Sequence, residues 1–258
     1  MLMASLTAQQ TTVPGPKPPA QAKTQKEFED YNKAYALSGG ATVDKAANDF
    51  AAAYPNSELR SFLYSKAMHE YQNEGNSAKT LEMGRKVVAL DPDNSIALVL
   101  TATVLADGLS DTDPDRQQKI AEIRKDSEHA LQTVDTAFVA PANATPEQVA
   151  NYKNTLRSMA RSALGIMELK TNDDAGAEKD LTAAADLTKT QPDPYIWYHL
   201  ALAQDHQKKY AVALASVTQA LQYTGSNADL KTLATAERDR LVQLTGGTLP
   251  PSGQKPPP

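Results

Sequence analysis

An internal repeat is the sequence feature that most constrains the fold of this chain. A pattern of small and large apolar residues occurs twice in the C-terminal half, with the second copy 36 residues after the first. At every position after the first, small residues correspond to small ones and large apolar residues to large ones. A fixed period of this length indicates one supersecondary unit repeated along the chain. The two copies are Ala163-Leu164-Gly165, Ala177, Leu181 and Ala184, and His199-Leu200-Ala201, Ala213, Val217 and Ala220.

The N-terminal half contains a similar pair of patterns at an offset of 34 residues. Spacings of three and four residues place each set on one face of a helix. A polar break at Glu74-Gly75-Asn76 then separates the first of these helices from a second apolar stripe. We therefore predict two short antiparallel helices per repeat and an all-α fold, in which neighbouring hairpins must stack to bury their apolar faces. The paired sets are Tyr64, Ala67, Met68 and Tyr71, and Leu98, Thr101, Ala102 and Leu105.

The order of residues in these units resembles the tetratricopeptide repeat. The unit from Tyr64 to Pro92 matches at both ends but departs in its middle, where Thr80 and Gly84 replace the usual alanine and aromatic residue. The resemblance covers residues 25–244 and implies a right-handed α-solenoid of stacked antiparallel helix hairpins. We expect about five hairpins plus a C-terminal capping helix. The best match is Trp197, Leu200, Ala201, Tyr210, Ala213, Val217 and Ala220-Leu221.

Two connections are longer than those of the tetratricopeptide family. Residues 109–115 follow a helix predicted at Ser95–Gly108. Residues 139–145 precede a long helix predicted from Pro146 to Thr171. The sequence assigns no role to either insertion. Leucines at helical spacing predict the capping helix at Ser226–Leu244.

Both ends of the chain differ in composition from the middle. Of the 16 prolines, nine lie in residues 14–19 and 250–258. Proline removes the backbone N–H that a helix needs, so we predict a disordered leader at 1–24 and a disordered Pro-rich tail at 245–258. The start, Met1 to Gln9, resembles the back half of a secretory signal peptide ending near Ala8, although Leu6 departs from the usual small residue. We expect a periplasmic or otherwise exported bacterial protein; a cytoplasmic protein with an ordinary leader is the alternative.

Composition and motifs argue against several classes of function. A net charge of -5 gives no basic face for nucleic acid. No apolar run approaches the roughly 20 residues that cross a bilayer. The chain has no cysteine, and its four histidines lack metal-ligand spacing, so we expect no metal site. The acidic loop near Asp111 lacks the glycine and glutamate of a calcium loop; we expect it to cap the next helix at Thr112 or Asp113. Without a phosphate loop or nucleophile elbow, we expect no cofactor and no catalysis.

The resemblance also implies where a partner would bind. In the tetratricopeptide family, the first helices of the hairpins line a concave groove. Some members clamp a peptide carboxylate with Lys and Asn there, but this chain has neither residue at the corresponding positions, so the groove would be apolar to aromatic. By register, the groove residues are Phe62, Ser65, His69, Gln72, Ile96, Val99, Thr103, Met159, Ser162, Ile166, Leu169, Tyr195, Tyr198, Leu202 and Asp205.

The function expected from these observations is a non-catalytic scaffold that binds a protein or peptide partner. An amphipathic helix or an extended apolar peptide would suit such a groove. The resemblance to bacterial envelope repeat proteins, seen at the junction Tyr54-Pro55-Asn56-Ser57, suggests work in the assembly of cell-envelope complexes. A cytosolic adaptor of the same fold is the alternative. A third hypothesis, in the class of enzymes, is a hydrolase or metal enzyme built on a helical-repeat fold.

Overall fold

The structure is a computed structural model that describes residues 20–139 and 143–246. These residues form eleven helices and no strand. The helices are α1 (Gln25–Tyr35), α2 (Gly40–Ala53), α3 (Leu59–Asn73), α4 (Ser77–Leu90), α5 (Ser95–Asp107), α6 (Arg116–Ala137), α7 (Pro146–Lys170), α8 (Asp174–Leu187), α9 (Pro194–His206), α10 (Tyr210–Tyr223) and α11 (Ala228–Thr245).

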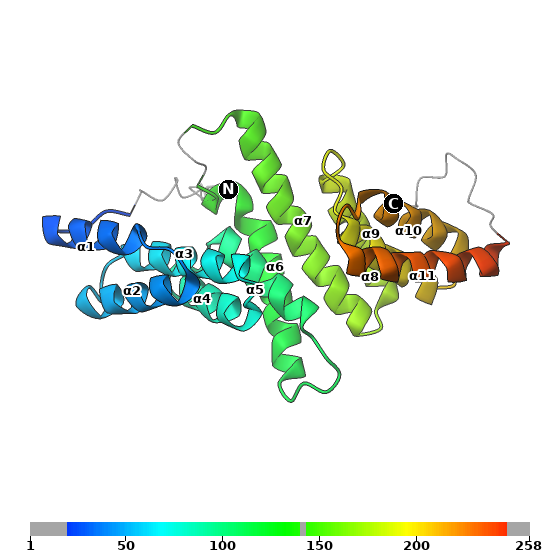
Figure 1. Ribbon diagram of the computed structural model, residues 1–258, viewed down its shortest axis with the longest axis horizontal. Helices are drawn as coiled ribbons and strands as arrows, with labels where there is room; N and C mark the ends of the chain where they lie inside the picture. Colours follow the sequence, from blue (N-terminus) through cyan, green and yellow to red (C-terminus); the bar gives the residue numbers. More distant parts are fainter. Residues whose placement is uncertain (1–19, 140–142, 247–258) are drawn as a thin grey trace, which may run out of the picture.

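Consecutive helices pack against one another along the whole molecule, which is elongated (Figure 1). The helices pair as α1–α2, α3–α4, α5–α6, α7–α8 and α9–α10, and α11 packs against α10 at the end of the series. The described residues therefore form an all-α solenoid of five stacked hairpins with a C-terminal capping helix. This confirms the fold class expected from the repeat.

Local sequence explains where most helices begin. The side chain of Asn76 accepts a hydrogen bond from the Lys79 amide at the start of α4. The longest helix, α7, begins with a full capping box between Thr145 and Gln148, followed by Pro146 in the first turn. The expected caps for α6 are wrong. That helix begins after Asp115, and the Asp113 carboxylate instead accepts a hydrogen bond from the Ser110 amide at 2.9 Å.

Small residues allow the helices to approach closely, as the repeat pattern predicts. A methyl group at Gly165 would lie 2.6 Å from Leu181 Cγ and 3.3 Å from the Ala177 carbonyl oxygen. A methyl group at Gly84 would lie 2.4 Å from Thr101 Oγ1. The distances of 2.6 and 2.4 Å are too short for real contacts, so a larger residue at either position requires the neighbouring side chain to move.

The third and fourth hairpins contain the two longest helices. α6 has 22 residues and α7 has 25. The N-terminal half of α7 packs with α6 over α5, where Val99 is fully buried in a cluster with Val134, Leu156 and Ala160. In Figure 1, α7 crosses the middle of the molecule and separates the N-terminal hairpins from the C-terminal ones. In the sequence, the two insertions flank α6, the helix that precedes α7.

The described chain begins on the surface of the first hairpins. Residues 20–24 fall in the predicted leader, yet Ala20 and Ala22 pack against the core cluster of the first two hairpins. Lys23 Nζ donates a hydrogen bond to the Asn56 carbonyl oxygen at 3.1 Å, and Thr24 caps α1. The predictions for residues 1–19, 140–142 and 247–258 lie outside the described residues. No helix within the described residues is long and apolar enough to cross a membrane.

Candidate partner-binding surface

Two hollows lie along the first helices of the hairpins. The first hollow has a volume of about 1030 Å³ and is bounded by residues 20–25, α1, α3, the start of α5 and the residues that follow α6. The predicted groove residues Phe62, Ser65, His69 and Ile96 line it. The sequence therefore placed one part of the candidate surface at a real concavity.

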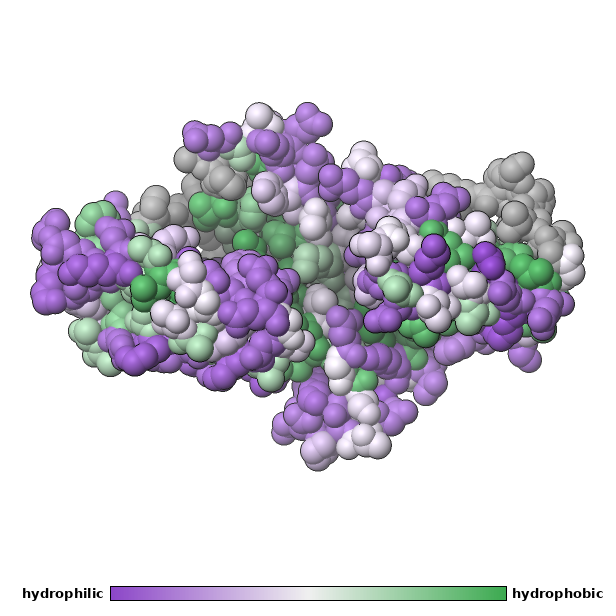
Figure 2. Space-filling view, in the orientation of Figure 1, coloured by the Kyte–Doolittle hydropathy of each residue, from purple (hydrophilic) through white to green (hydrophobic). Residues whose placement is uncertain are grey.

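Large apolar side chains surround the first hollow. Phe28 on α1 is 50% exposed, Phe62 on α3 48%, Ile96 on α5 36% and Val139 after α6 83%. Figure 2 shows apolar residues gathered in a recess between the N-terminal hairpins and α7, with hydrophilic residues around it. Exposed apolar side chains that converge on one concavity are typical of a binding site.

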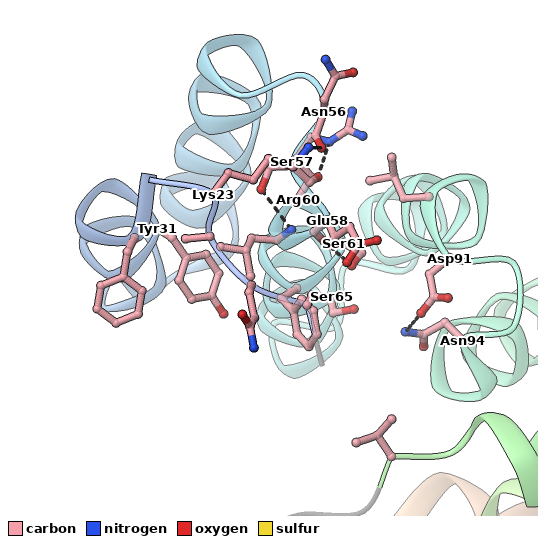
Figure 3. Close-up of a pocket in the computed structure, with 18 of the residues that line it drawn as sticks. Lys23, Tyr31, Asn56, Ser57, Glu58, Arg60, Ser61, Ser65, Asp91 and Asn94 are labelled. Atoms are coloured by element: carbon pink, nitrogen blue, oxygen red, sulfur yellow. Dashed lines mark hydrogen bonds between the residues drawn. The ribbon is translucent and has the colours of Figure 1, made fainter. Parts of the chain in front are cut away.

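Hydrogen bonds within the protein hold the polar groups at one edge of the first hollow in place. Arg60 Nε donates a hydrogen bond to the Ser57 carbonyl oxygen at 2.8 Å, and Lys23 does the same to Asn56 (Figure 3). Asn94 and Asp91 form a side-chain pair at 3.4 Å at the start of α5. These bonds fix the rim before any partner binds, which lowers the conformational entropy lost on binding.

The second hollow lies between α5, α7 and α9 and has a volume of about 1080 Å³. Its lining includes the predicted groove residues Thr103, Met159, Ser162, Ile166 and Tyr195. Most of the remaining lining residues are polar, as are many of the residues that line the first hollow. The polar residues include Asn151, Asn154, Thr155, Ser158, Thr188 and Gln191.

Three titratable groups with shifted pKa values face the second hollow. Burial raises the pKa of Asp107 and lowers the pKa values of Lys170 and His199. Lys170 Nζ donates to the carbonyl oxygens of Ala106 and Asp107, at 2.9 and 2.6 Å, and so caps the C-terminus of α5. His199 Nδ1 lies 2.9 Å from the Tyr195 carbonyl oxygen. These contacts hold helix ends and backbone, and they do not resemble a nucleophile–base pair.

Four predicted groove residues line neither hollow and instead pack against other helices, and of these only Val99 is fully buried. Val99 is fully buried under α6 and α7, and this is a correction to its expected outward position. Leu169 packs against the central core cluster. Tyr198 packs against the cluster beneath α11, and Asp205 forms an ion pair with Arg240 of α11 at 2.5 Å. The position of a residue within a repeat gives no information about contacts with helices distant in the sequence. The sequence therefore could not predict that these residues pack against such helices.

The last two predicted groove residues line neither hollow. Gln72 is exposed near the end of α3, with its Oε1 atom 3.4 Å from His69 Nδ1. Leu202 is half-buried on α9, one turn after Tyr198. The inner surface is therefore two hollows separated by α7, and not the single groove that the repeat suggested.

Several surface residues were absent from the sequence-based set. Phe28 lies in the first hairpin, before the units in which the repeat pattern is recognised, and Val139 begins the second insertion, so neither has an assigned position in a regular repeat. Residues 20–25 also line the first hollow. Within the described residues, no group of three or more His, Asp or Glu side chains could hold a metal ion.

Solved structures similar to this chain include two tetratricopeptide proteins. No protein-family model and no curated protein matches the sequence. A thermophilic TPR protein of Thermus thermophilus, TTC0263, is 15% identical, with 83% of this chain and 97% of that chain covered and a TM-score of 0.48. The TPR domain of P58(IPK) is also 15% identical, with 87% and 66% covered and a TM-score of 0.31. The arrangement of the helices described above, not these alignments, carries the fold assignment.

Proposed function

We propose that the protein is a non-catalytic scaffold that binds an apolar or amphipathic segment of a partner protein in the first hollow. The observation that carries the proposal is the set of four large apolar side chains on different elements, exposed around one concavity. Covering a large apolar side chain contributes roughly 1.5–3 kcal/mol. Four such groups around one hollow supply a driving force for association, and the entropy lost on binding reduces the net affinity.

The chemistry of the first hollow favours side-chain contacts over recognition of a peptide terminus. Ser65 and His69 occupy the positions where some tetratricopeptide proteins hold a carboxylate with Lys and Asn. The cations nearest the rim, Lys23 and Arg60, are already bonded to backbone carbonyls. An amphipathic helix whose apolar residues recur every three or four positions meets these requirements.

A selection from a random peptide library tests this proposal. We expect peptides selected on the intact chain to carry apolar residues at helical spacing. The double variant Phe62→Asp/Ile96→Asp should lose their binding by tenfold or more, because it places two charges against apolar side chains; tenfold corresponds to about 1.4 kcal/mol. Leu233→Asp on α11, where the leucine is 54% exposed, is the matched control and should bind as the parent does. Circular dichroism checks that all variants fold.

The proposal fails if the selected peptides bind the double variant as tightly as the parent chain. It also fails if binding is lost equally in Leu233→Asp, because the effect would then belong to surface charge in general. Isothermal titration calorimetry measures both comparisons. A negative heat-capacity change on binding is expected, since apolar surface leaves water.

We further propose that the protein is exported and works in the assembly of cell-envelope complexes. The support comes from sequence alone, namely the resemblance of Met1 to Gln9 to a signal peptide and the junction Tyr54-Pro55-Asn56-Ser57. Cell fractionation combined with the mass of the mature N-terminus tests the location. A cytosolic protein with Met1 intact would contradict export and favour the cytosolic adaptor.

A further inference from the structure

A slot lies between α4 and α6, away from both hollows. It consists of two adjoining concavities of about 530 and 590 Å³ that share Val88, Pro92, Ala121, Lys125 and Asp126. Leu98 of α5 adds to its apolar lining. The slot is built on the second helices of the hairpins, whereas the two hollows lie along the first helices. It is therefore a separate feature of the surface.

Asp126 is the unusual residue of the α4–α6 slot. Only 3% of its surface is exposed, yet within the described residues it makes no hydrogen bond and no ion pair. Burial, followed by the nearby charge of Glu122, raises its pKa to about 6. A buried carboxyl group without a partner is destabilising, and native structures usually pair such groups. Asp126 is thus a polar group that faces a concavity without a protein partner.

The other charges around the slot are already engaged with one another. Arg85 of α4 donates two hydrogen bonds to Glu122 of α6, at 2.7 and 2.6 Å. His129 Nε2 lies 2.7 Å from Asp93 Oδ1, between the end of α4 and α6. Both pairs bridge the slot and hold its two walls together.

Two further cations belong to α6 itself. Arg124 lies 4.0 Å from Glu128 along the helix. Lys125 is exposed at the mouth of the slot, and its charge lowers the pKa of Asp126 less than burial and Glu122 raise it. Burial and Glu122 together outweigh the opposite effects of Lys125, His129 and Arg85, so the ionised form of Asp126 is under-stabilised.

We propose that the α4–α6 slot binds a primary ammonium group at the end of an aliphatic chain, the chemistry of a lysine side chain of a partner protein. The walls formed by Val88, Pro92 and Ala121 suit the methylene groups. The carboxylate of Asp126 suits the ammonium group, which needs an acceptor when it leaves water.

Binding of this kind is coupled to the ionisation of Asp126. A cation within about 4–6 Å lowers the pKa of a carboxyl group by roughly 1–3 units. The ammonium ligand therefore binds the ionised form, and its affinity rises as the pH rises through about 6. Each unit by which the pKa falls corresponds to about tenfold tighter binding to the ionised form.

Carboxyl-carbon NMR of the full chain tests the proposal with n-butylammonium as the probe and n-butanol as its neutral match. We expect butylammonium to lower the pKa of Asp126 and butanol to leave it unchanged. At pH 7.5 butylammonium should bind about tenfold more tightly than at pH 4.5. Glu29, exposed on α1 and outside the slot, serves as an internal control for general ionic effects. The proposal is overturned if both probes act alike, or if Glu29 responds as strongly as Asp126.

Two variants and a second pair of probes complete the test. Asp126→Asn keeps the shape of the side chain and should abolish the preference for butylammonium over butanol; a preference that persists in this variant overturns the proposal. Lys125→Gln should strengthen butylammonium binding, because it removes a competing cation. The ligand could be a lysine side chain of a protein or a free small amine. Nα-acetyl-lysine methylamide, compared with its norleucine analogue, distinguishes these two sources. Tighter binding than butylammonium indicates a protein side chain, and equal binding indicates a free small amine.

Discussion

Glu168 lies on α7 at the interface with α8, and only 7% of its surface is exposed. Burial raises its pKa to about 7, and the neighbouring charges of Asp180 and Asp173 act in the same direction. Arg124 of α6 lowers this pKa, but by less than burial and the two aspartates raise it, and Arg161 of α7 is paired with Asp180. Because the folded pKa is above the ordinary 4.5, the folded chain binds this proton more tightly than the unfolded chain.

The pH dependence of stability follows from the raised pKa of Glu168 in the folded chain. The contribution of Glu168 is fully present below pH 4.5 and is lost as the pH rises through about 7. We expect Glu168→Gln to match the parent in free energy of unfolding at pH 4 and to exceed it at pH 8 by on the order of 2 kcal/mol. Urea unfolding at both pH values measures the difference. A difference that does not change with pH would contradict the assignment. Asp126 is present in both proteins, so its titration contributes equally to both free energies of unfolding and cancels in their difference.

Gly84 offers a second test on single residues. Gly84→Ala should destabilise the chain by about 1–3 kcal/mol, because the added methyl group meets Thr101 Oγ1 across the α4–α5 contact. Thr101→Ala removes that oxygen, which has no hydrogen-bond partner within the described residues. In the Thr101→Ala background, Gly84→Ala should therefore be neutral or stabilising. A double-mutant cycle by urea unfolding gives the coupling, and additive effects would exclude the steric explanation.

Contacts between helix ends tie distant elements together. Lys170 at the end of α7 caps α5 through two carbonyl oxygens, and Arg116 at the start of α6 donates to the Lys170 carbonyl oxygen at 2.7 Å. The ends of α5 and α7 and the start of α6 thus meet at one point. Residues 109–115 connect α5 to α6 beside it.

Loss of the Lys170 bonds at this junction should destabilise the connection between α5 and α6 locally. Lys170→Met keeps the aliphatic chain but loses both carbonyl bonds, and should lower the free energy of unfolding by about 1–2 kcal/mol. Hydrogen exchange at residues 108–115 should become faster than elsewhere. Lys231→Met, at an exposed position on α11, is the control and should change neither quantity. Uniform acceleration across the chain would argue against a local cap.

The helices themselves could largely be predicted from the sequence. The predicted boundaries of α5, α7 and α11 agree with the observed ones to within one or two residues. Capping residues and helical spacing are local, so they can be recognised in a short window. The burial of Val99 could not be recognised in this way, because α7 and α6 cover it from tens of residues further along the chain. The candidate surface was therefore predicted only in part.

At the scale of the whole molecule, each hairpin contacts mainly its neighbours. Leu241 of α11 is fully buried against Ala213, Val217 and Ala220 of α10. Leu241→Ala should lower the free energy of unfolding by about 2–5 kcal/mol through the cavity it leaves. Hydrogen exchange should become faster in α10 and α11 but not in α3 and α4. Equal acceleration in α3 and α4 would show that the chain unfolds as one cooperative unit.

The position of α7 limits the kind of ligand that can use the whole inner surface. Ile96 and Thr103, which line the first and second hollows, are about 10 Å apart along α5, with the covered Val99 between them. One straight helix cannot occupy both hollows. A partner that engages both must therefore be bipartite, with two short segments joined by a tether that passes over α7. The second segment would then bind at an effective concentration set by the length of that tether.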